Sequence, residues 1–345
     1  MKYVKSENPG TPLIGALRRK AITVSQRAWI KTECLQSESG PVVVRPAVSG
    51  VDLVSWTGNH GEWIESTLLR HGAILFRGFD IDAVEVFERF VNVVSTETLE
   101  YRERSSPRQQ VRGHIYTSTD YPASQSIFFH NENSYQRVWP MKLFFFCLIP
   151  AEEGGETPIA DSRKILQRLS RATLAGFEEK QCLYVRNFDD ALGLPWQTVF
   201  QTTDRSEVEQ SCRRANISFA WRDGNRLRTY AVRPVTAAHP RTGELVWFNH
   251  VAFFHFSTLE QSIREGLLAT MSEENLPANT YYGDGSPIEP WVLNEIREAY
   301  YDETVSFAWE KGDIVMLDNM LMAHSRAPYR GQRKILVAMA EPFGD

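Results

Sequence analysis

The segment Phe128-Phe129-His130-Asn131-Glu132-Asn133-Ser134-Tyr135 joins an apolar, strand-forming start to a histidine and a carboxylate two positions apart. In an extended strand, residues i and i+2 point to the same side. The sequence therefore predicts that His130 and Glu132 direct an imidazole nitrogen and a carboxylate oxygen to one point, as two ligands of a metal ion. Catalytic metal sites usually have three protein ligands, so a third must come from elsewhere in the chain.

His324 is the strongest candidate for the third ligand among the eight histidines. It follows a strand-like segment, 313–317, and the polar residues Asp318 and Asn319, and it precedes another strand-like segment. A late histidine between strands, combined with an earlier His-x-Glu pair, matches the triad of two histidines and one carboxylate that leaves open positions on a non-haem Fe(II). The other histidines fit ordinary roles in solvated turns (His60, His239), at a helix end (His71) or in aromatic stretches (His114, His250, His255).

Composition limits the class of protein. The 345 residues are 42% hydrophobic and 23% charged, with a net charge of −5, which gives no reason to expect a nucleic-acid or anionic-membrane partner. No apolar stretch reaches the roughly 18 residues of a membrane-spanning helix, and the first residues lack the apolar core of a secretory signal. The four cysteines are scattered, which favours reduced thiols and a cytoplasmic location.

Hydrophobic periodicity predicts a mostly β fold with decorating helices, in the α+β class. Apolar runs with strand character occupy 73–76, 143–149, 312–318 and 333–339, and helical spacing occupies 62–70, 83–94, 164–177 and 291–301. The stretch 178–240 is predicted to be rich in loops with short strands. We expect a single domain over residues 1–345, with residues 1–40 as an N-terminal extension.

Further motifs accompany the three candidate ligands: Gly154-Gly155-Glu156-Thr157-Pro158-Ile159-Ala160-Asp161-Ser162-Arg163, Gly312-Asp313 and His324-Ser325-Arg326. With them, the chain resembles the TauD/TfdA superfamily of Fe(II)/2-oxoglutarate dioxygenases from about residue 70 to its end. Within that superfamily it is most similar to the SyrP-like amino-acid oxygenases of natural-product biosynthesis. The resemblance implies a double-stranded β-helix, or jelly-roll, core with iron at one open end.

The resemblance assigns His130, Glu132 and His324 to Fe(II), and Thr157 to 2-oxoglutarate, which with O2 is a cosubstrate. Many relatives carry Asp at the position of Glu132. Halogenating relatives replace this carboxylate with a small residue, so Glu132 argues for oxygenation.

An arginine is also expected, because the far carboxylate of 2-oxoglutarate needs a guanidinium, ideally bidentate. In better-known relatives this arginine lies further along the last strand, at positions that hold Ala338 and Met339 here. We therefore predict Arg333, at the start of the last strand, as the cosubstrate arginine, with Arg326 as the alternative.

The implied reaction oxidises an unactivated C–H bond, by hydroxylation or by desaturation or cyclisation, and is coupled to decarboxylation of 2-oxoglutarate to succinate and CO2. The expected substrate is a small amino acid or an amino-acid-derived intermediate of secondary metabolism, free or tethered to a carrier protein. Oligomeric state is left open. Residues predicted to contact the substrate are Arg112, as partner of an α-carboxylate, and Asn133, Ser134 and Tyr135, which follow the ligand pair.

Two alternatives from other classes remain at this point. A non-catalytic jelly-roll binding protein would keep the barrel without turnover, although the intact His/Glu/His set argues against it. A zinc-dependent hydrolase would use the same three ligands, but it has no use for the Gly-Gly-Glu-Thr turn at 154–157.

Overall fold

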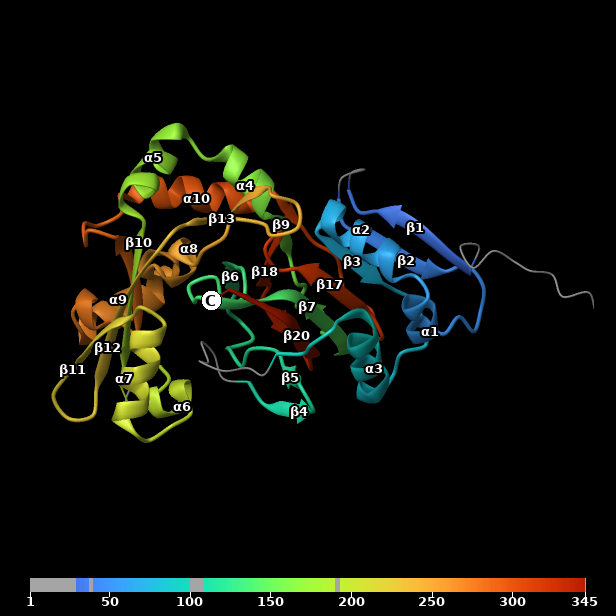
Figure 1. The fold of residues 1–345 in the computed structure, drawn as a ribbon, viewed down its shortest axis with the longest axis horizontal. Helices are drawn as coiled ribbons and strands as arrows, with labels where there is room; N and C mark the ends of the chain where they lie inside the picture. Colours follow the sequence, from blue (N-terminus) through green and yellow to red (C-terminus); the bar gives the residue numbers. More distant parts are fainter. Residues whose placement is uncertain (1–28, 37–39, 100–107, 190–192, 345) are drawn as a thin grey trace, which may run out of the picture.

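A computed structural model describes residues 29–36, 40–99, 108–189 and 193–344. Its main feature is an eight-stranded sheet that joins segments far apart in the sequence (Figure 1). The strands, in spatial order, are β1 (Ile30–Cys34), β2 (Val42–Pro46), β3 (Ala73–Phe76), β17 (Ile314–Asp318), β7 (Val138–Ile149), β20 (Lys334–Gly344), β5 (Ile115–Thr117) and β4 (Gln110–Arg112).

Strand β7 is buried on both faces, as its continuous apolar sequence predicts. Phe144 and Phe146 face the N-terminal helices, where they pack on Phe87 and Phe90 of α3 (Val84–Val94). Phe145, between them, faces a second sheet. Because alternate side chains leave a strand on opposite faces, one aromatic run contributes to two hydrophobic cores.

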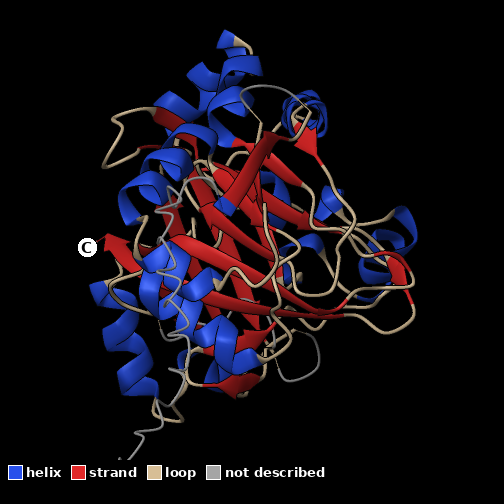
Figure 2. Cartoon of the chain, turned by 90° about the vertical axis from the view of Figure 1, so that its right-hand side faces the viewer, coloured by secondary structure: helices blue, strands red, loops and turns tan. Residues whose placement is uncertain are grey.

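The second sheet has four strands and packs against the first through the core that contains Phe145. Its order is β16 (Thr304–Val305), β9 (Ile159–Asp161), β18 (Met322–Arg326) and β6 (Ile127–His130). Figure 2 shows the strands stacked at the centre of the molecule with helices around them. The predicted jelly-roll core is confirmed, and both predicted histidine ligands belong to the second sheet.

A buried ion pair fixes the entry into β17. Arg77, directly after β3, donates from Nη2 to Asp313 Oδ2 over 2.6 Å and from Nε to Asp313 Oδ1 over 3.0 Å. The Arg77 guanidinium also donates to the Ala308 carbonyl. This explains the Gly312-Asp313 motif structurally, because the pair aligns β3 with β17, the strand that leads to His324.

Helices cover the outer faces of both sheets. On the large sheet lie α1 (Leu53–Gly58), α2 (Gly61–His71) and α3, and on the second sheet lie α4 (Ser162–Arg168) and α10 (Pro290–Asp302). Helix α5 (Arg171–Lys180) packs through Phe177 on Trp247 and Tyr282. The single helix expected over 164–177 is therefore two, because Leu169 leaves the helix and the Ser170 hydroxyl caps α5. No helix among the described residues is long and apolar enough to cross a membrane.

The stretch 178–240 is more ordered than predicted. It contributes three strands of a third sheet and two helices, and its apolar residues form a separate small core. The elements of this part and of the following segment are β10 (Cys182–Phe188), α6 (Trp196–Phe200), α7 (Arg205–Arg214), β11 (Ser218–Trp221), β12 (Leu227–Arg233), β13 (Thr236–Ala238), β14 (Leu245–Trp247), α8 (Val251–Phe254), η2 (Phe256–Thr258), α9 (Gln261–Thr270), η3 (Glu273–Asn275) and β15 (Ala278–Tyr282). Strands β13 and β14 pair with each other, and a second small pair, β8 (Glu153–Gly154) and β19 (Tyr329–Arg330), completes the topology of the described residues.

The predicted N-terminal extension, 1–40, lies mostly outside the described residues. Its described part is not an appendage, because β1 pairs antiparallel with β2 at the edge of the large sheet.

Candidate functional site

Strand pairing brings the two candidate histidines together. Strand β18 runs antiparallel to β6, and His324 is the cross-strand partner of His130, with ring centroids 4.3 Å apart. Side chains of directly opposed residues leave a sheet on the same face. One ligand atom each from His130, Glu132 and His324 lies within 4.8 Å of the others, a group that can hold a metal ion.

Glu132 reaches this group by a turn, so the prediction of a continuous strand through both residues was wrong. Strand β6 ends at His130, and the chain turns with a hydrogen bond from Ser134 N to Asn131 O. Asn319, between β17 and β18, fixes the turn: its Oδ1 accepts from Glu132 N over 2.7 Å, and its Nδ2 donates to Glu132 O over 2.9 Å. The same Nδ2 donates to Pro140 O.

The donor set suits a divalent transition metal. His130 Nδ1 lies 2.9 Å from the Phe128 carbonyl oxygen, which leaves Nε2 as the ligand nitrogen. The Nδ1 atom of His324 is buried without a hydrogen-bond partner among the described residues. Burial lowers the pKa of both imidazoles, that of His324 well below its usual value, so both are neutral at pH 7 and able to bind a metal. Two neutral imidazoles and one carboxylate are ligands that fit Fe(II).

Thr157 and Arg333 lie together beside the histidines, and both line the small cavity at the triad. Arg333 donates from Nε to Gly155 O over 2.8 Å and from Nη2 to the Thr157 hydroxyl over 3.4 Å. Thr157 also accepts from Trp309 Nε1. Burial and then the charge of Arg326 lower the pKa of Arg333 to about 10, so its guanidinium is protonated at neutral pH. These partners are uncharged, and a carboxylate would neutralise the guanidinium.

Arg326 lines the same cavity but already has three backbone partners. Its guanidinium donates to the carbonyl oxygens of Tyr121, Pro122 and Gln125 over 2.6–2.9 Å. Arg326 therefore anchors the 121–125 segment beside the site, which makes it a poorer candidate than Arg333 for the cosubstrate carboxylate.

The structure does not bring Arg112 to the site. It is exposed on β4 and donates to Glu88 and Glu85 of α3, so our prediction that it meets a substrate carboxylate has no support in the geometry. The prediction failed because the sequence gives no sign of the face on which a short edge strand presents an arginine.

Asn133, Ser134 and Tyr135 are buried and line neither of the cavities near the triad, contrary to the prediction. Asn133 has a φ of 59°, a left-handed turn conformation that asparagine tolerates. The Ser134 hydroxyl lies 2.6 Å from His250 Nδ1, and the Tyr135 ring packs on His250. Ser134 and Tyr135 therefore stabilise the turn that contains Glu132 through contacts with the buried His250.

A cavity of about 440 Å³ adjoins the small cavity at the triad and is the candidate substrate site. It shares Thr119 and Ile127 with the smaller cavity at the triad. Phe253 lines it and stacks on His130 with ring centroids 4.5 Å apart. This cavity was not predicted from the sequence, because its walls come from separate segments: 119–128, 193–194, 253–263 and the end of α10.

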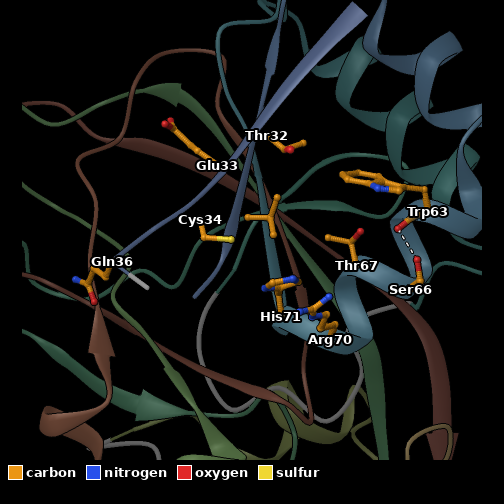
Figure 3. A pocket seen from close by; sticks show the side chains of 10 residues that line it. Thr32, Glu33, Cys34, Gln36, Trp63, Ser66, Thr67, Arg70 and His71 are labelled. Atoms are coloured by element: carbon orange, nitrogen blue, oxygen red, sulfur yellow. Dashed lines mark hydrogen bonds between the residues drawn. The ribbon is translucent and has the colours of Figure 1, made fainter. Parts of the chain in front are cut away.

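A separate groove of about 790 Å³ lies far from these residues in the chain, between β1 and α2 (Figure 3). Cys34 and His71 line it, but none of the predicted site residues does. His71 Nδ1 is already engaged with the Gly40 carbonyl oxygen. We assign no function to this groove.

Three residues around the triad were missed by sequence reasoning: Asn319, Arg108 and Phe253. Asn319 stood in the polar turn before His324, and its position between two strands was the available signal. Arg108 donates from Nη2 to Glu132 Oε2, which nothing in its sequence context indicates. His239, expected to be solvated, is buried with Nε2 3.0 Å from Asp318 Oδ2 and supports the same turn as Asn319.

Comparisons with known proteins identify the family and the fold. The model of the family described as "Taurine catabolism dioxygenase TauD, TfdA family" matches residues 37–339. The dapdiamide synthesis protein DdaC of Enterobacter agglomerans is 38% identical over 312 residues, which cover 87% of this chain and 94% of DdaC. A clavaminate synthase-like protein of Arabidopsis thaliana is 29% identical over 290 residues, covering 81% and 84% of the two chains. The structure of PvcB from Pseudomonas aeruginosa has the same fold, with a TM-score of 0.55 at 15% identity, covering 93% of this chain and 94% of PvcB.

Asn319→Ala tests the support of the Glu132 turn. The substitution leaves the Glu132 backbone N–H and carbonyl, both buried, without their partner, so we expect the free energy of unfolding to fall by about 3 kcal/mol. Urea denaturation measures the change. Asn59→Ala removes one exposed side-chain hydrogen bond at the end of α1 and should cost under about 1 kcal/mol. Equal losses in the two variants would contradict the role given to Asn319.

Proposed function

The chain belongs to the TauD/TfdA family of Fe(II)/2-oxoglutarate-dependent dioxygenases, and from this premise we infer that His130, Glu132 and His324 hold the iron. The observation that carries the inference is that His130 and His324 lie opposite each other on β6 and β18. One carboxylate oxygen of Glu132 lies within 4.8 Å of a ring nitrogen of each. Iron bound there supplies activation of O2 for C–H oxidation, at the expense of 2-oxoglutarate, which is converted to succinate and CO2.

Thr157 and Arg333 form the 2-oxoglutarate site in this proposal. The Arg333 guanidinium is charged, and its described partners are a carbonyl and a hydroxyl. A carboxylate at this position gains a charge-assisted hydrogen bond in a site of low dielectric constant. The neighbouring Thr157 hydroxyl, oriented by Trp309, provides a second polar contact.

The substrate, in this proposal, is a small amino acid or an amino-acid-derived intermediate that occupies the 440 Å³ cavity. The cavity is lined by aromatic side chains, among them Tyr121, Phe253 and Tyr301. Two exposed acidic residues, Asp120 and Glu260, also line it. Aromatic faces and carboxylates together attract an ammonium group. The similarity to a dapdiamide synthesis protein supports a biosynthetic substrate of this kind.

We propose that the reaction belongs to natural-product biosynthesis and ends in hydroxylation, desaturation or cyclisation of the substrate. The retained carboxylate of Glu132 favours these reactions over halogenation. The substrate is either free or tethered to a carrier protein, and both forms can be tested. A cytoplasmic location is supported by the four free cysteines, three of them buried. A single domain is supported by the family match over residues 37–339.

Succinate formation tests the activity. With Fe(II), ascorbate and 2-oxoglutarate, we expect succinate release that a matching substrate stimulates, measured against a panel of free and carrier-tethered amino acids. His324→Ala removes one iron ligand and should abolish release, whereas His114→Ala, an exposed histidine between β4 and β5, should leave it unchanged. Turnover supported by Zn(II) in place of Fe(II), or retained in His324→Ala, would refute the proposed iron site.

Arg333→Gln tests the cosubstrate site. Loss of a charge-assisted contact worth about 1.5–3 kcal/mol should raise the KM for 2-oxoglutarate roughly 10- to 150-fold. Arg326→Gln should mainly lower the Tm, because it frees the 121–125 carbonyls, and should shift this KM little. If Arg326→Gln raises the KM and Arg333→Gln does not, the assignment of the two arginines is reversed.

Ile263→Phe tests the substrate cavity. Ile263 lines the cavity from α9, so a larger side chain should lower kcat/KM for the substrate about tenfold, in the range set by a few methylene groups in an apolar pocket. Succinate formation without substrate should persist. Leu268→Phe is the matched control, since Leu268 is exposed on the same helix. An equal effect of both variants would place the substrate elsewhere.

A further inference from the structure

Arg108 forms an ion pair with the candidate iron ligand Glu132. Its Nη2 atom donates to Glu132 Oε2 over 2.7 Å, and the two side chains are only 4% and 3% exposed. Arg108 also lines the cavity that contains His130 and His324. It lies 24 residues before Glu132 in the sequence, ahead of β4, so the pair is a tertiary contact.

The pair constrains how the Glu132 carboxylate can bind a metal. A carboxylate binds a cation through one oxygen or through both. The Arg108 guanidinium engages Oε2, which leaves Oε1 as the oxygen that is free of this contact. Glutamate has one more rotatable bond than the aspartate of many relatives, so it has more freedom to turn both oxygens toward the ion.

We propose that Arg108 is a positioning residue that keeps Glu132 bound to iron through a single oxygen. This inference rests on the proposed role of Glu132 as an iron ligand. A metal ion that accepts six ligands would keep three positions beside three monodentate protein ligands, of which 2-oxoglutarate would need two and O2 one. Chelation by both Glu132 oxygens would take one of these positions. Arg108 thereby compensates for the longer side chain that replaces aspartate in this chain.

Charge supports the same role. A buried carboxylate that loses a partner carries a desolvation cost, and Arg108 offsets part of this cost in the metal-free site. The guanidinium is planar and rigid in its donor geometry, so it fixes the orientation of the carboxylate better than a flexible ammonium would. Arg108 needs no contact with either cosubstrate to act in this way.

Metal and cosubstrate affinities, measured without turnover, test the proposal. Titration calorimetry with Mn(II), and then with 2-oxoglutarate on the Mn(II)-loaded protein, is carried out on the full chain and its variants. In Arg108→Met, we expect the Mn(II) affinity to stay within about threefold of the parent, and the 2-oxoglutarate affinity to fall about 10- to 100-fold. Arg112→Met, which removes an exposed arginine paired with Glu85 and Glu88, is the matched control and should change neither affinity.

Shortening the carboxylate side chain separates positioning from a general structural role. In a Glu132→Asp background the restraint is dispensable, so adding Arg108→Met should change the 2-oxoglutarate affinity by less than about threefold, a non-additive result. Arg108→Lys, which keeps a cationic donor, should recover part of the affinity lost in Arg108→Met. Arg108→Gln replaces Arg108→Met in the same comparison if thermal unfolding shows that the latter is not folded.

Four results would overturn the proposal. A parallel loss of Mn(II) and 2-oxoglutarate binding in Arg108→Met would make Arg108 a general support of the metal site. A 2-oxoglutarate loss that persists in Glu132→Asp would indicate direct contact between Arg108 and the cosubstrate. Affinities like those of Arg112→Met would leave Arg108 without a role. If the parent chain itself binds no Mn(II), the iron-ligand assignment fails and the proposal fails with it.

Discussion

The pairing of β18 with β6 is the interaction on which the candidate site depends. Its register places His324 opposite His130, so a shift of one residue would turn one imidazole to the other face of the sheet. Side-chain packing stabilises this register, because Phe145 of the large sheet lies against His324 and Phe253 stacks on His130. The jelly-roll fold therefore brings two of the three predicted ligands together by strand pairing, which side-chain packing supports.

The carboxylate ligand, Glu132, is held differently, by hydrogen bonds from side chains. Glu132 lies in a turn, where no ladder fixes its backbone, and Asn319 replaces the ladder by bonding to both its N–H and its carbonyl. Asn319 belongs to the turn before β18, so one short segment positions both Glu132 and His324. The contact between His239 and Asp318 also stabilises this segment. Glu132 and His324 therefore depend on the same short segment.

Buried charge organises the surroundings of the triad. Arg108 pairs with Glu132 and Arg326 donates to three backbone carbonyls, so each of these buried guanidinium groups has polar partners away from water. Arg333 has fewer acceptors, because its guanidinium donates to one carbonyl and, over 3.4 Å, to one hydroxyl, whereas Arg326 donates to three carbonyls. A guanidinium at a cavity wall with fewer acceptors has more capacity for an anion, and this difference in hydrogen bonding separates Arg333 from Arg326 more clearly than their positions in the sequence.

The fold class, the candidate triad and the Thr157 turn could be predicted from the sequence, because ligand types and strand periodicity are local properties that persist through folding. The same reasoning favoured Arg333, which lies directly before β20 and donates to Thr157. The neighbours that meet the triad follow from tertiary packing. Asn133, Ser134 and Tyr135 turn into the interior, Arg112 pairs with α3, and Arg108 reaches Glu132, because these contacts depend on how separate elements pack and no single segment encodes them.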